Sequence, residues 1–226
     1  MTIAALLLPI ALLQAADTGT VLHSSDRGGA RFEHCVSQIE NDAESAYEEG
    51  MAWAAEGQAL GGYRCAAMAL IAQNRTEEGA RRLESLATAV NPNDPGLRAE
   101  LFSQAGNAWL LDRDAGHARS AFTRALVGMD ASPQRADLLI DRARAYAMER
   151  DYRHAEEDLS GALDARPNDP LALRLRASAR MHQNAFELAE ADALAATRIE
   201  PNNVDNYLIL GHVRESARTG TPVEEQ

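Results

Sequence analysis

The segment NPNDPGLRAE, residues 91–100, has a close copy in RPNDPLALR, residues 166–174, and a weaker copy in EPNNVDNYL, residues 200–208. Each copy stands directly before a run rich in Ala, Leu and Arg. Pro ends a helix and keeps the residue before it out of the helical conformation. The copied segment therefore predicts a joint between helical units, and the chain predicts an internal repeat.

The prolines of these joints give the length of the repeat. Pro167 and Pro201 are 34 residues apart, and Pro92 and Pro167 are 75 residues apart, which is two periods of 34 plus seven. The seven extra residues are visible as PGLR at 95–98 and PQR at 133–135. A fixed period of this length predicts an array of stacked supersecondary units.

Small and large residues recur at fixed places within each period of 34. Small residues hold the eighth place (Gly106, Ala143, Ala177, Gly211), the twentieth (Ala118, Ala155, Ala189) and the twenty-seventh (Ala125, Ala162, Ala196). Large residues between them are Phe102, Trp109, Phe122, Leu139, Tyr146 and Leu159. Small residues let two helix backbones approach closely, and large ones fill the groove between the helices. With this pattern the chain resembles tetratricopeptide-repeat proteins of the exported bacterial type, over residues 61–216.

The resemblance implies an all-α fold, a right-handed solenoid of stacked antiparallel helix pairs. The composition agrees, since 46% of the residues are hydrophobic but only 5% are aromatic, and Ala and Leu dominate. We expect a degenerate helical hairpin at 31–60, repeats at about 61–94, 99–132, 136–169 and 170–203, a capping helix at 204–216 and a disordered tail at 217–226. The weak first repeat, counted from Gly61, places Met68, Ala80, Ala87 and Pro92.

The N-terminus is expected to be a secretory signal peptide at residues 1–16, MTIAALLLPIALLQAA, followed by a flexible linker at 17–30. The run is apolar and ends in small residues around Ala15 and Ala16, but no Lys or Arg precedes it. A retained anchor and an amphipathic cytoplasmic end are the alternatives. The expectation places the protein in the periplasm or outside the cell, without a stable membrane span after cleavage.

The two cysteines, Cys35 and Cys65, stand 30 residues apart. An even pair in an exported chain favours a disulfide, which would stabilise the fold by about 3.5 kcal/mol through loop closure. Two buried thiols are the alternative, with redox or metal chemistry as a third. The disulfide would attach the degenerate first hairpin to the next repeat.

Charge and motifs exclude several classes of function. The formal net charge is −12 and all 22 basic residues are Arg, so long-range repulsion disfavours nucleic acid as a partner. The six histidines show no metal-ligand spacing, and the chain contains no nucleophile elbow, P-loop or dinucleotide fingerprint. The acidic run at 39–50 is best interpreted as a solvated helix face, and the sequon at Asn74 as a turn. We expect neither an enzyme nor a cofactor nor a metal site.

The resemblance implies where a partner would bind. In tetratricopeptide-repeat proteins the first helix of each repeat lines a concave groove, and its second, fifth, sixth, ninth, twelfth and thirteenth places meet the ligand. Those places here include Gln104, Asn107, Leu110, Asp141, Arg144, Met148, Arg174, Ser178, His182 and His212. Asn107 and Arg144 resemble part of the family's clamp for a terminal carboxylate, but the clamp lysines are absent and Asp141 would repel such a group.

The functional prediction is therefore a non-catalytic scaffold of the cell envelope that binds a protein or peptide segment in its groove. Arg144 and Arg174 are the best candidates for charged contacts. The alternative is a self-associating structural component, a homo-oligomer whose groove is unused.

Overall fold

The computed structural model describes residues 29–57, 60–129 and 133–224, and its regular elements are eleven α-helices. They are α1 (Ala30–Ile39), α2 (Ala43–Ala55), α3 (Leu60–Ala72), α4 (Thr76–Ala89), α5 (Pro95–Leu111), α6 (Ala115–Leu126), α7 (Pro133–Met148), α8 (Tyr152–Ala165), α9 (Pro170–His182), α10 (Phe186–Ile199) and α11 (Val204–Thr219). The predicted all-α solenoid is confirmed. The expected signal peptide and most of the expected linker lie outside the described residues.

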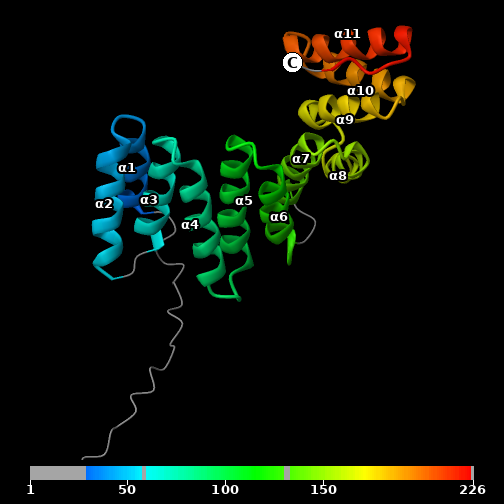
Figure 1. Cartoon of the computed structure of the whole chain (residues 1–226). Helices are drawn as coiled ribbons and strands as arrows, with labels where there is room; N and C mark the ends of the chain where they lie inside the picture. The colour runs from blue at the N-terminus through cyan, green and yellow to red at the C-terminus, as the bar shows by residue number, and fades with distance from the viewer. Residues whose placement is uncertain (1–28, 58–59, 130–132, 225–226) are drawn as a thin grey trace, which may run out of the picture.

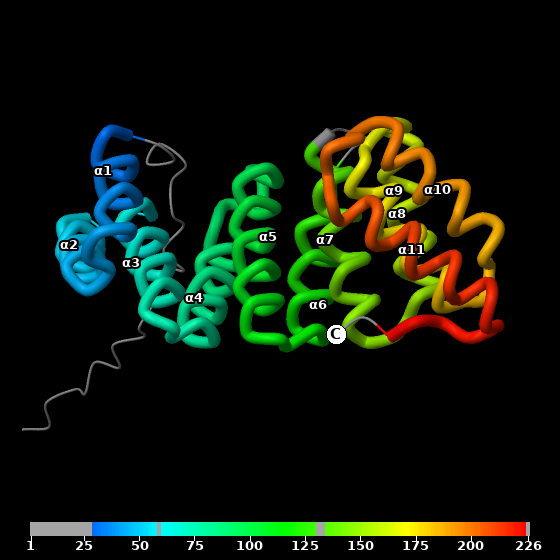
Figure 2. Tube along the Cα trace, turned by 90° about the horizontal axis from the view of Figure 1, so that it is seen from above, coloured from blue at the N-terminus to red at the C-terminus, as the bar shows by residue number. Residues whose placement is uncertain are grey.

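Consecutive antiparallel helices stack into a curved array that turns along its length. In Figure 1 the helices α2–α5 stand upright, whereas α9–α11 lie nearly at right angles to them. Figure 2 shows the same array from above, with α1–α4 at one end and α9–α11 at the other. The helix α5 also contacts α7, α7 contacts α9, and α9 contacts α11, so the odd-numbered helices from α5 to α11 form one continuous layer.

The joint inside each repeat is a left-handed residue that ends the first helix. Four residues have φ between 60° and 62°: Asn74, Arg113, Arg150 and Asn184. After each of them, the next N–H donates to the carbonyl five residues earlier, at 2.9 Å in all four joints. This is the Schellman arrangement, which satisfies carbonyls at the end of a helix. The same next residue is the N-cap of the following helix.

The joint between repeats is built by the segment that recurs in the sequence. Asp94 and Asp169 accept hydrogen bonds from the N–H groups of Leu97 and Ala172, and Pro occupies the first turn of α5 and of α9. A capping Asp followed by Pro is a strong helix start. The repeated proline and aspartate thus end one repeat and begin the next.

The left-handed Asn74 also corrects the starting residue of the weak first repeat, which sets the numbering of its places. Aligned with Arg113, Arg150 and Asn184, it starts this repeat at Leu60, one residue before the Gly61 suggested by the sequence pattern. Ala67 then takes the eighth place, where it is fully buried, whereas Met68 is half-buried. The sequence erred because both residues are apolar and only the turn distinguishes the two frames.

The N-terminal helices are held by glycines and a disulfide. A Cβ on Gly50 would lie 2.9 Å from the Gly62 carbonyl, and one on Gly62 would lie 2.6 Å from the Gly50 carbonyl. The backbones of α2 and α3 therefore touch, and neither glycine tolerates a side chain. Cys35 and Cys65 form a disulfide that joins α1 to α3, with Cα atoms 6.2 Å apart.

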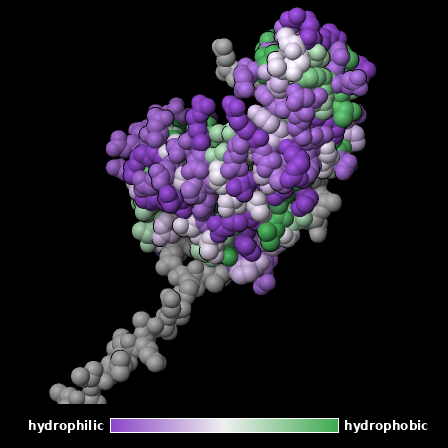
Figure 3. All heavy atoms as spheres, turned by 45° about the vertical axis from the view of Figure 1, so that its right-hand side comes forward, coloured by the Kyte–Doolittle hydropathy of each residue, from purple (hydrophilic) through white to green (hydrophobic). Residues whose placement is uncertain are grey.

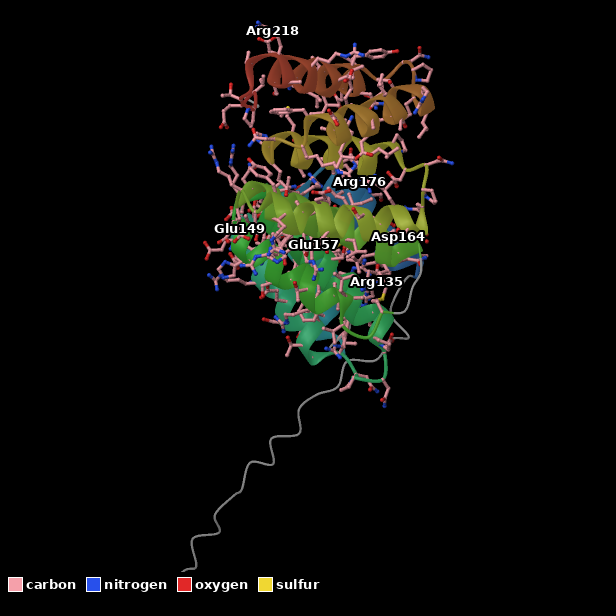
Figure 4. All side chains as sticks on the ribbon, turned by 90° about the vertical axis from the view of Figure 1, so that its right-hand side faces the viewer. Arg135, Glu149, Glu157, Asp164, Arg176 and Arg218 are labelled. Carbon is pink, nitrogen blue, oxygen red and sulfur yellow. A yellow bond between two sulfur atoms is a disulfide. The ribbon has the colours of Figure 1, made fainter. Side chains whose placement is uncertain are left out.

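Two buried ion pairs recur with the period of the repeat. Arg142 binds both carboxylate oxygens of Asp158 at 2.7 Å, and Arg176 binds both oxygens of Asp192 at 2.8 Å. Figure 4 shows Arg176 between α8 and α9. Each Arg also donates to a hydroxyl of the preceding repeat, Thr123 or Ser160. These pairs fix the orientation of neighbouring repeats.

The C-terminal helix is longer than the sequence suggests. The expected capping helix stops at residue 216, whereas α11 extends to Thr219 and ends at the left-handed Gly220. Beyond it, the Val223 N–H donates to the Ser216 hydroxyl and Glu224 reaches Arg150 at 3.5 Å. In the described part of the chain, no helix combines the length and apolar character needed to cross a membrane.

Arg113 offers a test of the turn geometry, because it is exposed and strained at φ 61°. Arg113→Gly removes the steric cost of a left-handed backbone conformation, about 1–2 kcal/mol. Gly also gives the unfolded chain more conformational entropy, which costs about 0.5–1 kcal/mol on folding. The net effect should be a slightly higher free energy of unfolding. The β-branched Arg113→Val should lower it by about 1 kcal/mol or more. Urea unfolding of both variants checks the order, and a Val variant as stable as the Gly variant would contradict the geometry.

The Arg142–Asp158 pair offers a second test. Asp158→Ala leaves the largely buried Arg142 guanidinium without its carboxylate and should cost about 3 kcal/mol in unfolding free energy. The double variant Arg142→Ala with Asp158→Ala should cost less than that single change, because Ala105 and Ala121 hold the same two places in α5 and α6. Arg153→Ala, which breaks the exposed pair with Glu157, is the control and should change stability by less than about 0.5 kcal/mol. A double variant less stable than Asp158→Ala would refute the argument.

Candidate functional site

The layer of odd-numbered helices carries two cavities along its exposed side. One, of about 540 Å³, lies between α5 and α7, and the other, of about 300 Å³, lies between α9 and α11. Cavities of this size accommodate side chains of a bound segment. The larger is lined by Gly96, Ala99, Glu100, Ser103, Gln104, Met129, Gln134, Asp137 and Leu138; the smaller by Arg174, Leu175, Ser178, Asp205, Leu208, Ile209 and His212. We call the surface that holds both cavities the groove.

Gln104 lies in the larger cavity and is held by Arg64 of α3. The Arg64 Nε donates to the Gln104 Oε1 at 3.0 Å, and its Nη2 forms a short ion pair with Glu100. The Arg64 guanidinium also lies over the ring of Phe32, 4.8 Å from its centroid. Because the Arg64 side chain is buried, it fixes one wall of the cavity and orients the amide of Gln104.

Asn107, Asp141 and Arg144 come together further along α5 and α7. Arg144 Nη1 lies 3.3 Å from the Asp141 Oδ1, and Asn107 hydrogen-bonds to the same carboxylate. Burial raises the pKa of Asp141 above its usual range, although both partners act in the opposite direction. A carboxylate held at a cost in desolvation is typical of a site kept for a purpose other than stability.

Arg174, Ser178 and His212 line the smaller cavity. Arg174 Nη1 donates to Asp205 Oδ2 at 2.8 Å, so an ion pair bridges the rims of α9 and α11. Leu175, Leu208 and Ile209 supply apolar surface between these polar groups. The structure thus places three of the residues named from the sequence around one cavity.

His182 is on the same helix as Arg174 but has a different environment. Its ring stacks on Tyr152 of α8, with centroids 4.3 Å apart and an angle of 9° between the planes. The lining of the smaller cavity does not include it. The stack joins two successive repeats, so packing gives a sufficient explanation for His182.

Sequence reasoning named Asp141 but missed three other acids of the groove, Glu100, Asp137 and Asp205. Arg64 at the fifth place pairs with Glu100 at the second place of the next repeat, and Arg174 pairs with Asp205 in the same relation. The sequence signal that could have predicted these ion pairs is an Arg followed by an acidic residue 31 or 36 positions later. The one-residue error in the first repeat hid it, because Arg64 fell outside the groove places. Asp137, a third lining acid, pairs with Arg166 at 2.7 Å.

Two histidines that seemed unrelated share one structural role. His117 stacks on Trp109, and both its N–H and its ring bind the capping Asp114. His154 repeats these contacts with Tyr146 and Asp151. The backbone N–H of His117 is the main group that lowers the pKa of Asp114. Within the described ranges, no three His, Cys, Asp or Glu residues gather in a way that could hold a metal ion.

The charge arrangement defines what the groove can bind. Arg64, Arg144 and Arg174 each have a carboxylate partner, respectively Glu100, Asp141 and Asp205. A terminal carboxylate entering the groove would have to displace one of these acids and would meet its charge. Apolar surface and hydrogen-bonding groups remain for recognition.

Comparison with known proteins supports the fold. No family model matches the sequence, and no curated protein sequence matches it. Among solved structures, YrrB, described as a tetratricopeptide-repeat protein with an unusual peptide-binding site, is 18% identical; the match covers 76% of this chain and 86% of YrrB, with a TM-score of 0.58. The Cut9–Hcn1 hetero-tetramer of the APC/C is 20% identical, covering 78% of this chain and 34% of the matched one, with a TM-score of 0.59.

A smaller match has the same architecture. The second tetratricopeptide-repeat domain of human RPAP3, solved in complex with an HSP70 peptide, is 24% identical to this chain. The match covers 53% of this chain and 98% of that domain, with a TM-score of 0.50. At these identities the likeness concerns the fold. Together with the 34-residue period and the repeated joints, it identifies the chain as a solenoid of the tetratricopeptide-repeat fold.

Proposed function

We propose that the protein is a non-catalytic interaction module that holds a segment of a partner protein in its groove. The observation that carries the proposal is the pair of cavities between odd-numbered helices, each lined by both apolar and polar side chains. YrrB is described as having a peptide-binding site, and the RPAP3 domain was solved with a peptide, so the same architecture serves peptide binding elsewhere.

The paired charges suggest the chemistry of the bound segment. Because the groove arginines already have carboxylate partners, we infer an internal segment that inserts apolar side chains, and not a free C-terminus. The larger cavity offers Leu138, Met129 and Ala99 as apolar surface. Gln104 and Asn107 can hydrogen-bond to the backbone of an extended or helical segment.

We further propose that the protein works in the cell envelope. The disulfide between Cys35 and Cys65 is compatible with an oxidising compartment, where such bonds form and persist. The apolar run at residues 1–16 supports export. The setting is a proposal independent of the groove.

Photo-crosslinking in the native cell tests the binding role. A photoreactive amino acid replaces Arg144 in one strain and Glu157 in another; Arg144 is in the groove layer, and Figure 4 shows Glu157 on the outer side of α8. Both residues are exposed, so neither replacement should disturb the fold. We expect an adduct with another protein from position 144 and none from position 157, and mass spectrometry of the adduct identifies the partner.

Other crosslinking results would count against the proposal. Adducts only from position 157 would move the binding surface to the outer side. Adducts only with a second copy of the chain would favour the self-associating alternative, and light scattering of the purified protein would then show a concentration-dependent mass.

Asp141→Asn tests whether the groove carboxylate is kept at the expense of stability. Burial raises the pKa of Asp141 in the folded state, so its ionised form lowers stability at neutral pH. This loss fades as pH falls from the raised folded-state pKa to the unfolded-state value of ~3.9, and it is absent below both. The variant should therefore be more stable than the native protein at pH 7, with the difference shrinking toward pH 3.5. Urea unfolding at both pH values measures it.

The same variant separates stability from binding. If Asp141 serves recognition, crosslinking from position 144 should weaken in Asp141→Asn although the protein is more stable. A variant less stable at pH 7 would show that the bonds from Arg144 and Asn107 outweigh the cost of burial, and the carboxylate would then be a structural group.

A further inference from the structure

The last helix of the described stack, α11, has one buried and one open side. Its buried side packs against α9 and α10, and its buried residues are Asn206, Ile209, Leu210, Val213 and Ser216. The opposite side presents Val204, Tyr207, Leu208 and Gly211, which we call the α11 outer face. The exposed fractions of its three side chains are 68%, 51% and 54%. Figure 1 shows α11 at the end of the array, with α10 and α9 below it.

The α11 outer face has the sequence pattern of the first helix of a repeat, on the side that packs against the second helix. Tyr207 and Gly211 stand at the fourth and eighth places of the repeat. In the earlier repeats the fourth place is buried, as in Phe102, Leu139 and Leu173. There the second helix of the same repeat contributes to this cover, since α5 packs extensively on α6, α7 on α8 and α9 on α10. On α11 the equivalent surface is open.

The glycines at the eighth place show what is missing. A Cβ built on Gly106 would lie 2.6 Å from a ring carbon of Phe122, so the α6 aromatic ring fills this notch. A Cβ built on Gly211 meets no atom within 4 Å of it in the described residues. The described residues that follow α11, 220–224, leave the notch open as well. The chain therefore contains one filled and one empty copy of the same helix-binding surface.

An apolar outer face is the opposite of what the end of a solenoid needs for solubility, since terminal repeats normally present polar residues. Figure 3 shows a mostly hydrophilic surface, with hydrophobic residues near the end of the molecule that α10 and α11 form. At the other end, α1 exposes polar residues, among them Arg31, Glu33 and Ser37. An apolar face retained at one end indicates that something covers it.

Charge and shape indicate the kind of occupant. Arg180 at the eleventh place binds Asp192 on the second helix of its own repeat, 2.8 Å away. Arg180 also binds Glu156 of the preceding repeat at 2.8 Å. Arg214, at the eleventh place on α11, makes the corresponding bond to Glu190 at 2.7 Å, and in the described residues no acid takes the place of Asp192. An occupant with an acid beside Arg214 and a large apolar residue over Gly211 would reproduce the contacts of the internal repeats. A second copy is disfavoured, because each copy has a net charge of −12 and the α1 end is polar.

We propose that the α11 outer face docks an amphipathic helix from a partner protein, lying antiparallel to α11 as α6 lies on α5. The helix places an aromatic or large aliphatic side chain on Gly211 and an acidic side chain beside Arg214. This second surface adjoins the groove, because Leu208 also lines the smaller cavity, but Tyr207, Gly211 and Arg214 lie outside the lining of both cavities. Docking would cover the α11 outer face as α6 covers α5.

The chain itself supplies a probe. The sequence of α8, residues 152–165, has an acid at residue 158 followed by a large apolar residue at 159, the two places that the proposal requires. A fluorescent peptide of this sequence carries Leu159→Phe to match Phe122 and a side-chain crosslink to hold the helix, since short peptides are poorly helical. The control peptide carries Asp158→Lys in addition. Fluorescence anisotropy measures binding to the full chain.

Three protein variants locate the binding. Gly211→Gln fills the notch from an exposed position, and Tyr207→Ser removes the exposed ring; both should weaken binding at least about tenfold. Arg144→Ala changes the groove and should leave binding unchanged. Circular dichroism and thermal unfolding confirm that all three variants fold. The control peptide should also bind more weakly than the probe by about tenfold.

Three results would overturn the proposal. They are no binding to the native chain, equal binding to Gly211→Gln, or a dimer in solution that Gly211→Gln abolishes, which would make a second copy the occupant. Because the groove is tested by crosslinking at position 144, failure of one surface is distinguishable from failure of the other.

Discussion

The fold depends on one constraint, which is that no helix pair in the chain can bury its own apolar side. Each pair approaches closely through small residues, and a large residue of one helix fills the space left by a small residue of the other, as Phe122 does over Gly106. The remaining apolar surface is covered only by the next pair. The stack, its curvature and the groove between odd-numbered helices all follow from this dependence, because the same contact recurs at every joint.

The period of the repeat carries more than the apolar pattern. In the helix pairs α7–α8 and α9–α10, Arg142 and Arg176 form ion pairs with an Asp of the second helix. In the helix pair α5–α6 the same two places hold Ala105 and Ala121, and no ion pair forms there. Buried ion pairs contribute little net stability compared with apolar residues, yet they tolerate few geometries. Arg142 also bonds to Thr123 of α6, and Arg176 bonds to Ser160 of α8. We interpret the Arg176 pair as a device that sets the angle between α7–α8 and α9–α10, where Figure 1 shows the array turning.

The sequence was sufficient for the architecture because proline, aspartate and small residues act locally. The PND segment marks the joint between repeats whatever surrounds it, and the 34-residue spacing aligns the helices. The groove residues were harder to predict, since their roles depend on partners in other repeats. Gln104 is positioned by Arg64, forty residues away, and His182 is turned to a stacking contact by Tyr152. The one-residue error in the first repeat shows the limit of the sequence. An Ala and a Met stand side by side and both are apolar, so the pattern does not tell which of them takes the eighth place. The left-handed conformation of Asn74, which only the structure reveals, decides it.

The two proposed surfaces differ in what they cost the protein. In the groove the charges are already paired and only Asp141 is held against its solvation preference, so a free groove is a stable state. The α11 outer face has no such compensation, since Tyr207, Val204 and Leu208 lie in water beside an empty notch. These side chains are already partly buried, so a helix covering them would gain about 1–2 kcal/mol from each, before the entropic cost of association. The uncovered end of the solenoid is therefore the place where the structure gains most from a partner.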